Sequence, residues 1–290
     1  MKRYRQLILG VFMLLCTLVS VQGQTEKSLL WEISGKGISE PSYLFGTIHI
    51  ICEDQVPMTE AMKAAFGKTE QLVLEINMSD QAAMTQAATL MMNMEGYDYK
   101  GLMSEGSYKR LDSLMTANLG MGMAMGRIMK PLGLMGVAYL GMLDCENASG
   151  MEEELQKLME EQGKTMGGLE TIESQIAIFD GIPIKEQISW LDEMMNDSGE
   201  GKEDFEKLMK NYLAQDIQAM YDSFEEYPEY EKYADVLLEN RNRDWIPKMA
   251  EMMGEKATFF AVGAMHLGGD IGVINLLREE GYTVKAVPNN

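Results

Sequence analysis

Short apolar segments with the composition of β-strands lie near both ends of this chain, and they constrain its fold more than any other feature. They are rich in aliphatic and aromatic residues and are bounded by Gly, Pro or polar clusters, as strands commonly are. The expected strands are residues 29–34, 43–48, 71–76, 257–262 and 282–287. Helical patterns at 59–68 and 269–280 alternate with these strands, which is typical of a sheet that is covered by helices.

The long middle of the chain, from residue 79 to about 255, has a helical composition rich in Met, Glu, Lys, Ala and Leu. One interruption, at residues 165–170 with the sequence T-M-G-G-L-E, predicts a strand that leads into a helix at 173–179. Because apolar strands must pair to be buried, the two ends of the chain have to meet across this middle. We therefore expect an α/β (α+β) fold, with a mixed central sheet built from N- and C-terminal segments and a large helical insertion.

Residues 117–143 are apolar and rich in Gly and Met, so their composition resembles that of a membrane-spanning segment. Arg127, Lys130 and Pro131 interrupt them, and charged residues are unfavourable in a lipid-exposed helix. We expect a buried or lid-like helical hairpin instead. The 28 methionines of the chain are compatible with Cu(I) binding, but their helix-like spacing favours a role as fillers of an irregular core.

The first 23 residues have the pattern of a secretory signal peptide. Three basic residues precede an apolar run that is short for a membrane anchor and ends in a typical cleavage site. Cys16 raises the alternative of a lipoprotein, but Leu15 precedes it where lipidation sites carry a small residue. We expect residues 24–290 to form a single domain, exported to the periplasm or outside the cell, with no stable membrane span after cleavage.

Acidic residues outnumber basic residues by 45 to 25, so the chain has a formal net charge of −20 at pH 7. This surplus argues against nucleic acid and anionic membrane surfaces as partners, whereas a cationic peptide or a metal ion would be tolerated. After cleavage only Cys52 and Cys145 remain. The sequence leaves open whether they form a disulfide, and it also leaves the oligomeric state open.

The two histidines of the chain stand in matching settings, Gly46-Thr47-Ile48-His49 and Gly263-Ala264-Met265-His266, each at the end of an expected strand. In open α/β sheets, ligands bind at the ends of strands. Glycine at such a place permits either a sharp turn or the close approach of another group. We interpret the histidines as functional residues at the rim of the sheet, and the alternative is that each fills a structural role in the core.

Glu75 interrupts the apolar run Q-L-V-L-E-I at the end of a strand that should be buried. A buried carboxylate needs a partner, because an unpaired charge is costly to bury. A divalent metal ion (Mn, Co or Zn) bound by His49, Glu75 and His266 would provide one, and two imidazoles with a carboxylate are typical of catalytic metal sites. The alternative for Glu75 is a salt bridge with an arginine.

Three further residues are candidates for this site. Glu170 ends the expected strand at 165–170 and is a candidate general base, or a residue that orients a ligand histidine. Arg241 and Asn242 lie in the helical segment before the second histidine motif. Arg241 has the chemistry to bind a carboxylate or stabilise an oxyanion, and Asn242 has the chemistry to orient either group.

Together these residues resemble the TraB/GumN family, which includes the Tiki metalloprotease domains and is related more distantly to the ChaN and erythromycin-esterase-like folds. The family is marked by two Gly-x-x-His motifs and a glutamate on the strand after the first motif, here Glu75. The resemblance extends from about residue 29 to 287 and includes G-L-E-T at 168–171. Glu152 stands where relatives more often have aspartate, so we interpret it as structural.

The resemblance implies an exported metal-dependent hydrolase that acts on peptides or proteins, with His49, Glu75 and His266 as metal ligands. The sequence contains no H-E-x-x-H helix, which excludes a zincin mechanism. A second hypothesis is a non-catalytic binding protein that sequesters a peptide signal, haem or a metal through the same two histidines. An enzyme needs Glu75, whereas a haem-binding protein does not.

Overall fold

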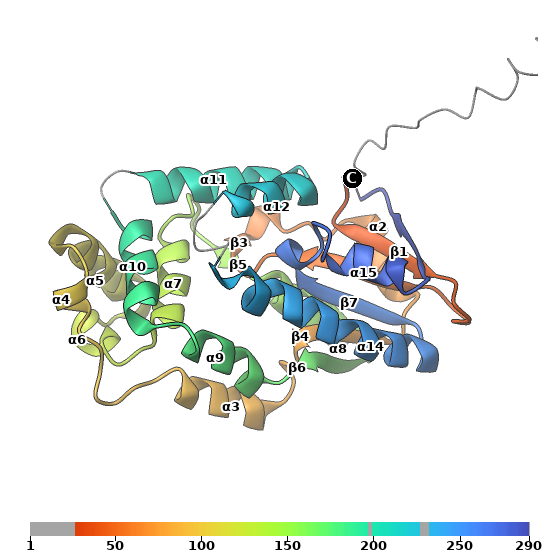
Figure 1. Ribbon diagram of the computed structural model, residues 1–290, viewed down its shortest axis with the longest axis horizontal. Helices are drawn as coiled ribbons and strands as arrows, with labels where there is room; N and C mark the ends of the chain where they lie inside the picture. The colour runs from red at the N-terminus through yellow and green to blue at the C-terminus, as the bar shows by residue number, and fades with distance from the viewer. Residues whose placement is uncertain (1–26, 197–198, 227–231, 290) are drawn as a thin grey trace, which may run out of the picture.

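A six-stranded mixed sheet forms the centre of the computed structural model, which describes residues 27–196, 199–226 and 232–289 (Figure 1). Its strand order is β6-β4-β7-β2-β1-β8. The strands are β1 (Leu30–Ser34), β2 (Ser42–Thr47), β4 (Gln71–Ile76), β6 (Thr165–Glu170), β7 (Thr258–Gly263) and β8 (Thr283–Ala286). The sheet thus combines N- and C-terminal strands with a central helical region, which confirms the expected fold class. The signal peptide expected at 1–23 lies outside the described residues, as does Cys16.

The four strands β6, β4, β7 and β2 run parallel to one another, while β1 pairs antiparallel with both β2 and β8. Thr47 of β2 pairs with Gly263 of β7, and Ile76 of β4 pairs with Glu170 of β6. The carboxyl ends of four neighbouring strands therefore meet at one edge of the sheet, which is where open α/β sheets bind ligands. The strand at 165–170 belongs to this central sheet although it lies within the helical middle.

Helices pack on the sheet through apolar faces. In α2 (Glu60–Gly67), Met62 and Phe66 are completely buried, and the Phe66 ring meets Phe259 of β7 edge-on at a centroid distance of 5.2 Å. The Thr59 side chain caps this helix by accepting a hydrogen bond from the Met62 N–H. The helices α14 (Asn240–Glu255) and α15 (Val273–Glu279) pack against each other in front of the sheet (Figure 1).

The helical middle extends to one side of the sheet (Figure 1). Its helices are α3 (Gln81–Leu90), α4 (Tyr99–Leu102), α5 (Glu105–Leu119), α6 (Met123–Gly126), α7 (Pro131–Leu140), α8 (Met151–Glu161), α9 (Ile172–Asp180), α10 (Ile184–Met194), α11 (Glu200–Leu213) and α12 (Ile217–Glu225). The chain also contains the short elements β3 (Ile51–Cys52), η1 (Glu53–Gln55), β5 (Ala148–Ser149), the π-helical turn η2 (Asp235–Glu239) and η3 (Ala264–His266). None of the helices in the described ranges is both long and apolar enough to cross a membrane.

Residues 117–143 form less regular structure than the expected helical hairpin. Helix α5 ends at Gly120, which adopts a left-handed conformation, and the single turn α6 separates it from α7. Pro131 occupies the first turn of α7, where its missing N–H costs no hydrogen bond. Met115 and Met123 are completely buried, as expected of methionines that fill the core, whereas Met121 and Met125 of the same stretch are exposed.

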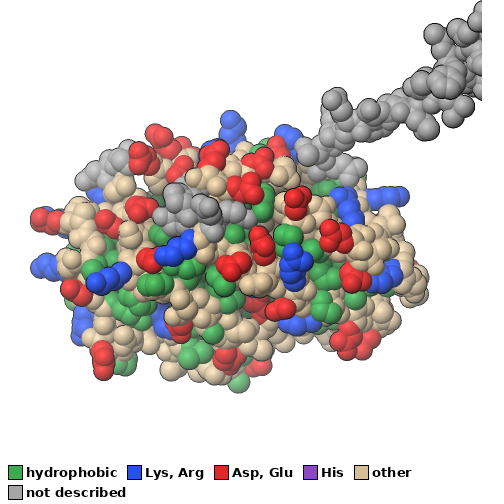
Figure 2. Space-filling model, in the orientation of Figure 1, with side chains coloured by type: hydrophobic (Ala, Val, Ile, Leu, Met, Phe, Trp, Pro, Cys, Tyr) green, Lys and Arg blue, Asp and Glu red, His purple; other side chains and the backbone are tan. Residues whose placement is uncertain are grey.

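A disulfide joins Cys52 to Cys145, with a Cα–Cα distance of 5.9 Å. Cys52 ends β3, which pairs with β5 directly before α8. The bond therefore fixes the loop that carries His49 to the start of α8. Figure 2 shows acidic side chains distributed over the face viewed, with basic ones between them rather than gathered in a patch.

Candidate functional site

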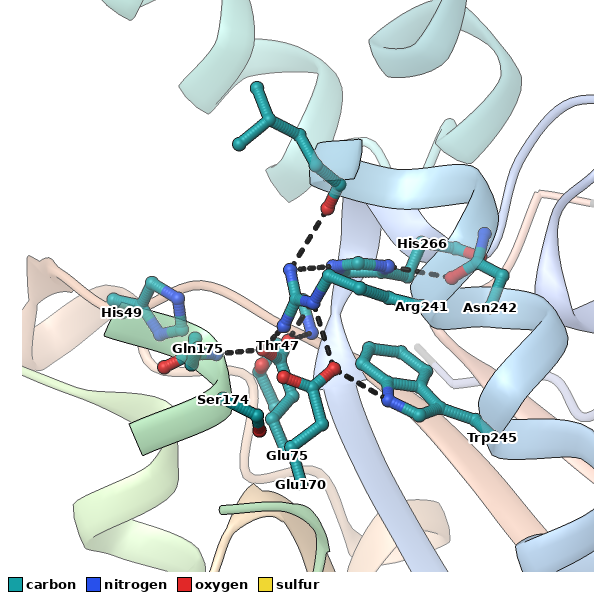
Figure 3. Close-up of polar contacts among 12 residues, drawn as sticks. Thr47, His49, Glu75, Glu170, Ser174, Gln175, Arg241, Asn242, Trp245 and His266 are labelled. Carbon is teal, nitrogen blue, oxygen red and sulfur yellow. Dashed lines mark hydrogen bonds and ion pairs between the residues drawn. The ribbon is translucent and has the colours of Figure 1, made fainter. Parts of the chain in front are cut away.

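The candidate site lies at the carboxyl ends of the parallel strands (Figure 3). Glu75 comes from the end of β4 and Glu170 from the last residue of β6. The two Gly-x-x-His motifs leave the neighbouring strands β2 and β7, and His266 ends the short helix η3. Arg241 reaches the same place from the first turn of α14. Five segments that are distant in sequence, β2, β4, β6, β7 with η3, and α14, thus supply these polar side chains.

Glu75 is buried, with 9% of its surface exposed, and both of its carboxylate oxygens have partners. Oε1 accepts a hydrogen bond from the Gly263 N–H at 2.8 Å. Oε2 accepts from Arg241 Nη2 at 2.6 Å and from Gln175 Nε2 at 3.0 Å. Burial alone would raise the pKa of Glu75, but interaction with the His266 imidazole and the Arg241 guanidinium lowers it to about 2. Glu75 is therefore a carboxylate at neutral pH.

Arg241 is the centre of this network. Its Nε donates to Glu170 Oε1 at 2.8 Å, and its Nη1 donates to the Leu237 carbonyl at 3.0 Å. Nη1 also lies 3.0 Å from His266 Nε2. The π-helical turn η2 directly precedes α14, and such turns often occur at functional sites. One guanidinium thus compensates two buried carboxylates, a role for which its planar fork of donors is suited.

Glu170 has one satisfied and one unsatisfied oxygen. Oε1 accepts from Arg241 Nε and, at 2.6 Å, from Trp245 Nε1. Oε2 is buried and has no hydrogen-bond partner among the described residues. An unsatisfied buried carboxylate oxygen is rare in native proteins and costs free energy, so this atom is open to a proton donor or a ligand.

His266 is buried, with 4% of its surface exposed, and Asn242 orients it. The Asn242 side chain donates from Nδ2 to the Ile271 carbonyl at 2.8 Å, so its Oδ1 accepts from His266 Nδ1 at 2.6 Å. This arrangement assigns the proton to Nδ1 and the lone pair to Nε2, which accepts from Arg241. Burial lowers the pKa of His266 to about 3, so its imidazole is neutral at neutral pH.

His49 lies apart from this network, on the loop after β2, and 72% of its side chain is exposed. Its Nδ1 lies 3.0 Å from Glu152 Oε1, which also accepts a hydrogen bond from Thr47 Oγ1 at 2.6 Å. The hydrogen bond to Glu152 raises the pKa of His49 above its ordinary value. Glu152, which the sequence indicated to be structural, therefore positions a candidate ligand from the first turn of α8.

The three expected metal ligands lie in the same part of the molecule but are not arranged to coordinate one metal ion. His266 Nε2 lies 3.9 Å from Glu75 Oε1, and His49 lines the same cavity as Glu75. Within the part of the chain that the structure describes, no group of three His, Cys, Asp or Glu side chains is arranged to hold a metal ion. Glu75 instead forms the salt bridge with an arginine that the sequence left as the alternative.

The chemistry of the donor set nevertheless fits a divalent metal ion. Both histidines have Nδ1 held by an oxygen, Asn242 Oδ1 for His266 and Glu152 Oε1 for His49, and this is how ligand histidines are usually oriented for binding through Nε2. His266 is neutral and Glu75 is ionised, as ligands must be, whereas His49, with its pKa raised to about 9, must release a proton to bind a metal ion. The guanidinium of Arg241 takes up the lone pair of His266 Nε2, so a metal ion there competes with Arg241.

The glycines of the two motifs permit close approach rather than a left-handed turn. A Cβ atom on Gly46 would lie 3.1 Å from Ala264 Cβ, in the second motif. Gly263 has a φ of −49°, and a Cβ there would lie 3.3 Å from Glu75 Oε1. The first glycine thus lets η3 pack on β2, and the second leaves room for the Glu75 carboxylate beside its N–H. Of the two explanations that the sequence offered, close approach is correct.

The sequence did not predict the contacts that Trp245, Glu152 and Gln175 make with the site residues. Trp245 lies four residues after Arg241 in α14, and helical spacing could have placed it on the same face. Its ring packs against the His266 ring in a tilted arrangement, with a centroid distance of 4.4 Å. Gln175 lies in the first turns of α9 and binds Glu75 across 100 residues of sequence, which no local pattern indicates.

The sequence is similar to those of known proteins. The sequence matches the TraB/PrgY/gumN family over residues 29–286. It is also similar to Metalloprotease TIKI2 from Danio rerio, with 22% identity over 318 aligned residues that cover 90% of this chain and 61% of the relative. The chain thus spans less than two thirds of the length of that relative. No solved structure matches the chain. Because the family match covers almost all of the described residues, this chain belongs to the TraB/PrgY/gumN family.

Proposed function

We propose that this protein is an exported metal-dependent hydrolase that cleaves peptide bonds, of the TraB/GumN (Tiki-like) type. The environment of His266 carries the proposal: a neutral buried imidazole whose tautomer is set by Asn242. Its Nε2 atom, which accepts from Arg241, lies 3.9 Å from the ionised carboxylate of Glu75. The similarity to a protein named a metalloprotease supports the same conclusion, since it covers 90% of this chain.

His266, Glu75 and His49 would hold the metal ion, which we expect to be Mn, Co or Zn. When bound, such an ion lowers the pKa of a water molecule toward neutrality and polarises a carbonyl. Asn242 keeps the Nδ1 proton of His266 in place, and Glu152 does the same for His49 through its carboxylate. Gln175 and the Gly263 N–H hold the two oxygens of Glu75 in a fixed orientation.

Glu170 is the candidate general base. Its Oε1 is held by Arg241 and Trp245, so the carboxylate cannot rotate freely, and its Oε2 remains available to accept a proton. Arg241 holds a positive charge between the two carboxylates and is the candidate group that binds a substrate carbonyl or stabilises an oxyanion. Each of these roles is a proposal for this chain.

Metal analysis of the mature protein, purified without chelator, tests the proposal directly. We expect one equivalent of a divalent metal, and we expect Glu75→Gln and His49→Ala each to abolish its retention. Glu173→Gln is the matched control, because Glu173 is an exposed carboxylate on α9 near the site. Peptide-library cleavage with added Mn²⁺, Co²⁺ or Zn²⁺ then tests hydrolysis, and unchanged metal content in both site variants would overturn the assignment of ligands.

A non-catalytic binding protein is the second candidate, and one observation favours it. Arg241 already compensates Glu75, so the buried network is satisfied there without any bound ion. Only His49 is exposed enough to meet a large ligand such as haem, because His266 is buried. A Soret band on addition of haem, lost in His49→Ala and unaffected in Glu75→Gln, would support this candidate over the hydrolase.

A further inference from the structure

A cavity of about 350 Å³ opens beside Glu75 and has two chemically different ends. Its polar end is formed by His49, Glu75, Glu152, Glu153 and Gln175. The rest of its wall is apolar and includes Met78, Met84, Ala87, Met91, Ile172 and Ile176. No lysine or arginine is among the described residues that line it. The volume is near the lower limit of ligand-binding pockets, about 300 to 1,000 Å³, so it suits one large side chain rather than a large cofactor.

One part of the apolar wall is formed by α3, a helix that contributes no fully buried residue to the core. None of the residues of α3, all of which are described, is fully buried. Met84, Ala87 and Met91 are half-buried and recur at helical spacing, so they form one face of α3 and its C-terminus. This face borders the cavity rather than a closed core. The exposed apolar surface is a cost in water, and a bound apolar group would remove that cost.

The opposite wall belongs to the same helix that orients Glu75. Gln175 of α9 donates to Glu75 Oε2, and Ile172 and Ile176 of the same helix line the cavity. In Figure 3, Gln175 points from α9 toward Glu75. A side chain seated between α3 and α9 therefore places the adjoining peptide backbone next to Glu75 and His49.

We propose that this cavity is the subsite that binds a large apolar side chain of the peptide substrate, such as leucine, methionine or phenylalanine. The proposal rests on the proposed peptidase function and names its substrate class. Methionine side chains are flexible and polarisable, so a wall built from them accommodates aliphatic and aromatic shapes. Acidic side chains are disfavoured, because Glu152 and Glu153 also line the cavity and bring no compensating positive charge for a carboxylate.

Paired peptides that differ only by leucine or asparagine test the subsite, because these side chains have nearly the same shape and differ in polarity. The pairs are scanned through each position of a peptide that the metal-loaded protein cleaves. We expect one position at which leucine raises kcat/KM about tenfold or more over asparagine, as apolar pockets typically discriminate. Equal kcat/KM at every position would overturn the subsite.

Two substitutions on one helix provide the matched variants. Ala87→Phe fills the cavity, whereas Ala88→Phe adds the same ring to an exposed neighbouring position. We expect Ala87→Phe to lower kcat/KM for the leucine peptide about tenfold and Ala88→Phe to leave it within twofold. Met84→Glu should shift the preference at that position from leucine to lysine, a gain that a merely misfolded variant does not show. No effect of Ala87→Phe and no shift in Met84→Glu would contradict the proposal.

Equilibrium binding separates this inference from the proposed catalysis. The peptides that differ by leucine or asparagine compete with Nile red, a neutral apolar fluorophore, for the metal-free protein. Displacement by the leucine peptide that is weakened in Ala87→Phe, together with no cleavage under any metal, would retain the subsite and reject the hydrolase. Cleavage without any preference for apolar side chains would retain the hydrolase and reject the subsite.

Discussion

Arg241 and Glu75 form a buried ion pair in which Nη2 lies 2.6 Å from Oε2, although the two residues are 166 positions apart. The same guanidinium contacts Glu170 and the Nε2 atom of His266. A protein-borne cation thus occupies the space between residues that the family resemblance assigns to a metal ion. Breaking such a pair from one side is costly because a charge is left buried without compensation.

Replacing Arg241 by glutamine should therefore lower the free energy of unfolding of the metal-free protein by about 3 to 5 kcal/mol. Denaturant unfolding followed by circular dichroism measures this change. Divalent metal should stabilise the variant more than the native protein, because the Arg241 guanidinium no longer competes with the metal ion for His266 Nε2 and the carboxylates. Equal metal-induced stabilisation of both proteins would show that Arg241 and metal do not compete.

Asn242→Ala should remove the acceptor for the Nδ1 proton of His266. A buried donor without a partner costs about 1 to 3 kcal/mol, so we expect a loss of stability in that range. Nitrogen NMR of the imidazole should show the Nδ1-protonated tautomer in the native protein and a mixture in the variant. Asn242→Asp keeps an acceptor and should retain the tautomer, so a tautomer mixture there as well would contradict this assignment.

Glu152→Gln should lower the pKa of His49 toward about 6.5, the value of an unperturbed histidine. The hydrogen bond to the Glu152 carboxylate favours the charged imidazolium, so its loss shifts the equilibrium toward the neutral form. Proton NMR resolves this titration easily, because the chain contains two histidines and His266→Gln assigns them. An unchanged pKa in the variant would mean that Glu152 does not act on His49 in solution.

The stability of the protein should fall as the pH is lowered from about 6.5 to 5. His266 has a folded pKa lowered to about 3, so in this window the unfolded chain binds a proton that the folded protein does not. The loss approaches 1.4 kcal/mol per pH unit at its steepest. His49 has a raised pKa, so below a pH of about 6.5 it is protonated in both the folded and the unfolded protein. It therefore changes the pH dependence of stability only at higher pH. The free energy of unfolding of His266→Gln, measured with urea, should depend less on pH between these two values than that of the native protein.

Replacing both Cys52 and Cys145 by serine should destabilise the protein by about 2 to 5 kcal/mol, since the disulfide closes a long loop. The two residues are 93 positions apart. Cys52 ends β3, directly after the loop of His49, so the variant should also weaken the contact between His49 and Glu152. A pKa of His49 equal to that of the native protein would show that the disulfide has no part in holding this loop.

Local patterns predicted the strands closely because each depends on neighbouring residues. The segment 71–76 forms β4 with the expected bounds, and 165–170 forms β6 within a region that is otherwise helical. The short helices around Gly120 and Pro131 were not predicted, because a glycine-rich apolar stretch is compatible with several packings. Pairing of Cys52 with Cys145 was left open for a similar reason, since it requires knowledge of how β3 meets β5.

By itself, the sequence determined which residues end the parallel strands: Glu75, Glu170 and the two Gly-x-x-His motifs, because apolar periodicity and glycine placement are local properties. Only the tertiary structure decided how their side chains are partnered. Packing of α14 against β6 and α15 brings Arg241 between Glu75 and His266, and packing of α8 gives His49 its own carboxylate in Glu152. Such contacts join residues more than twenty positions apart, and they exist only once the elements carrying them have packed together.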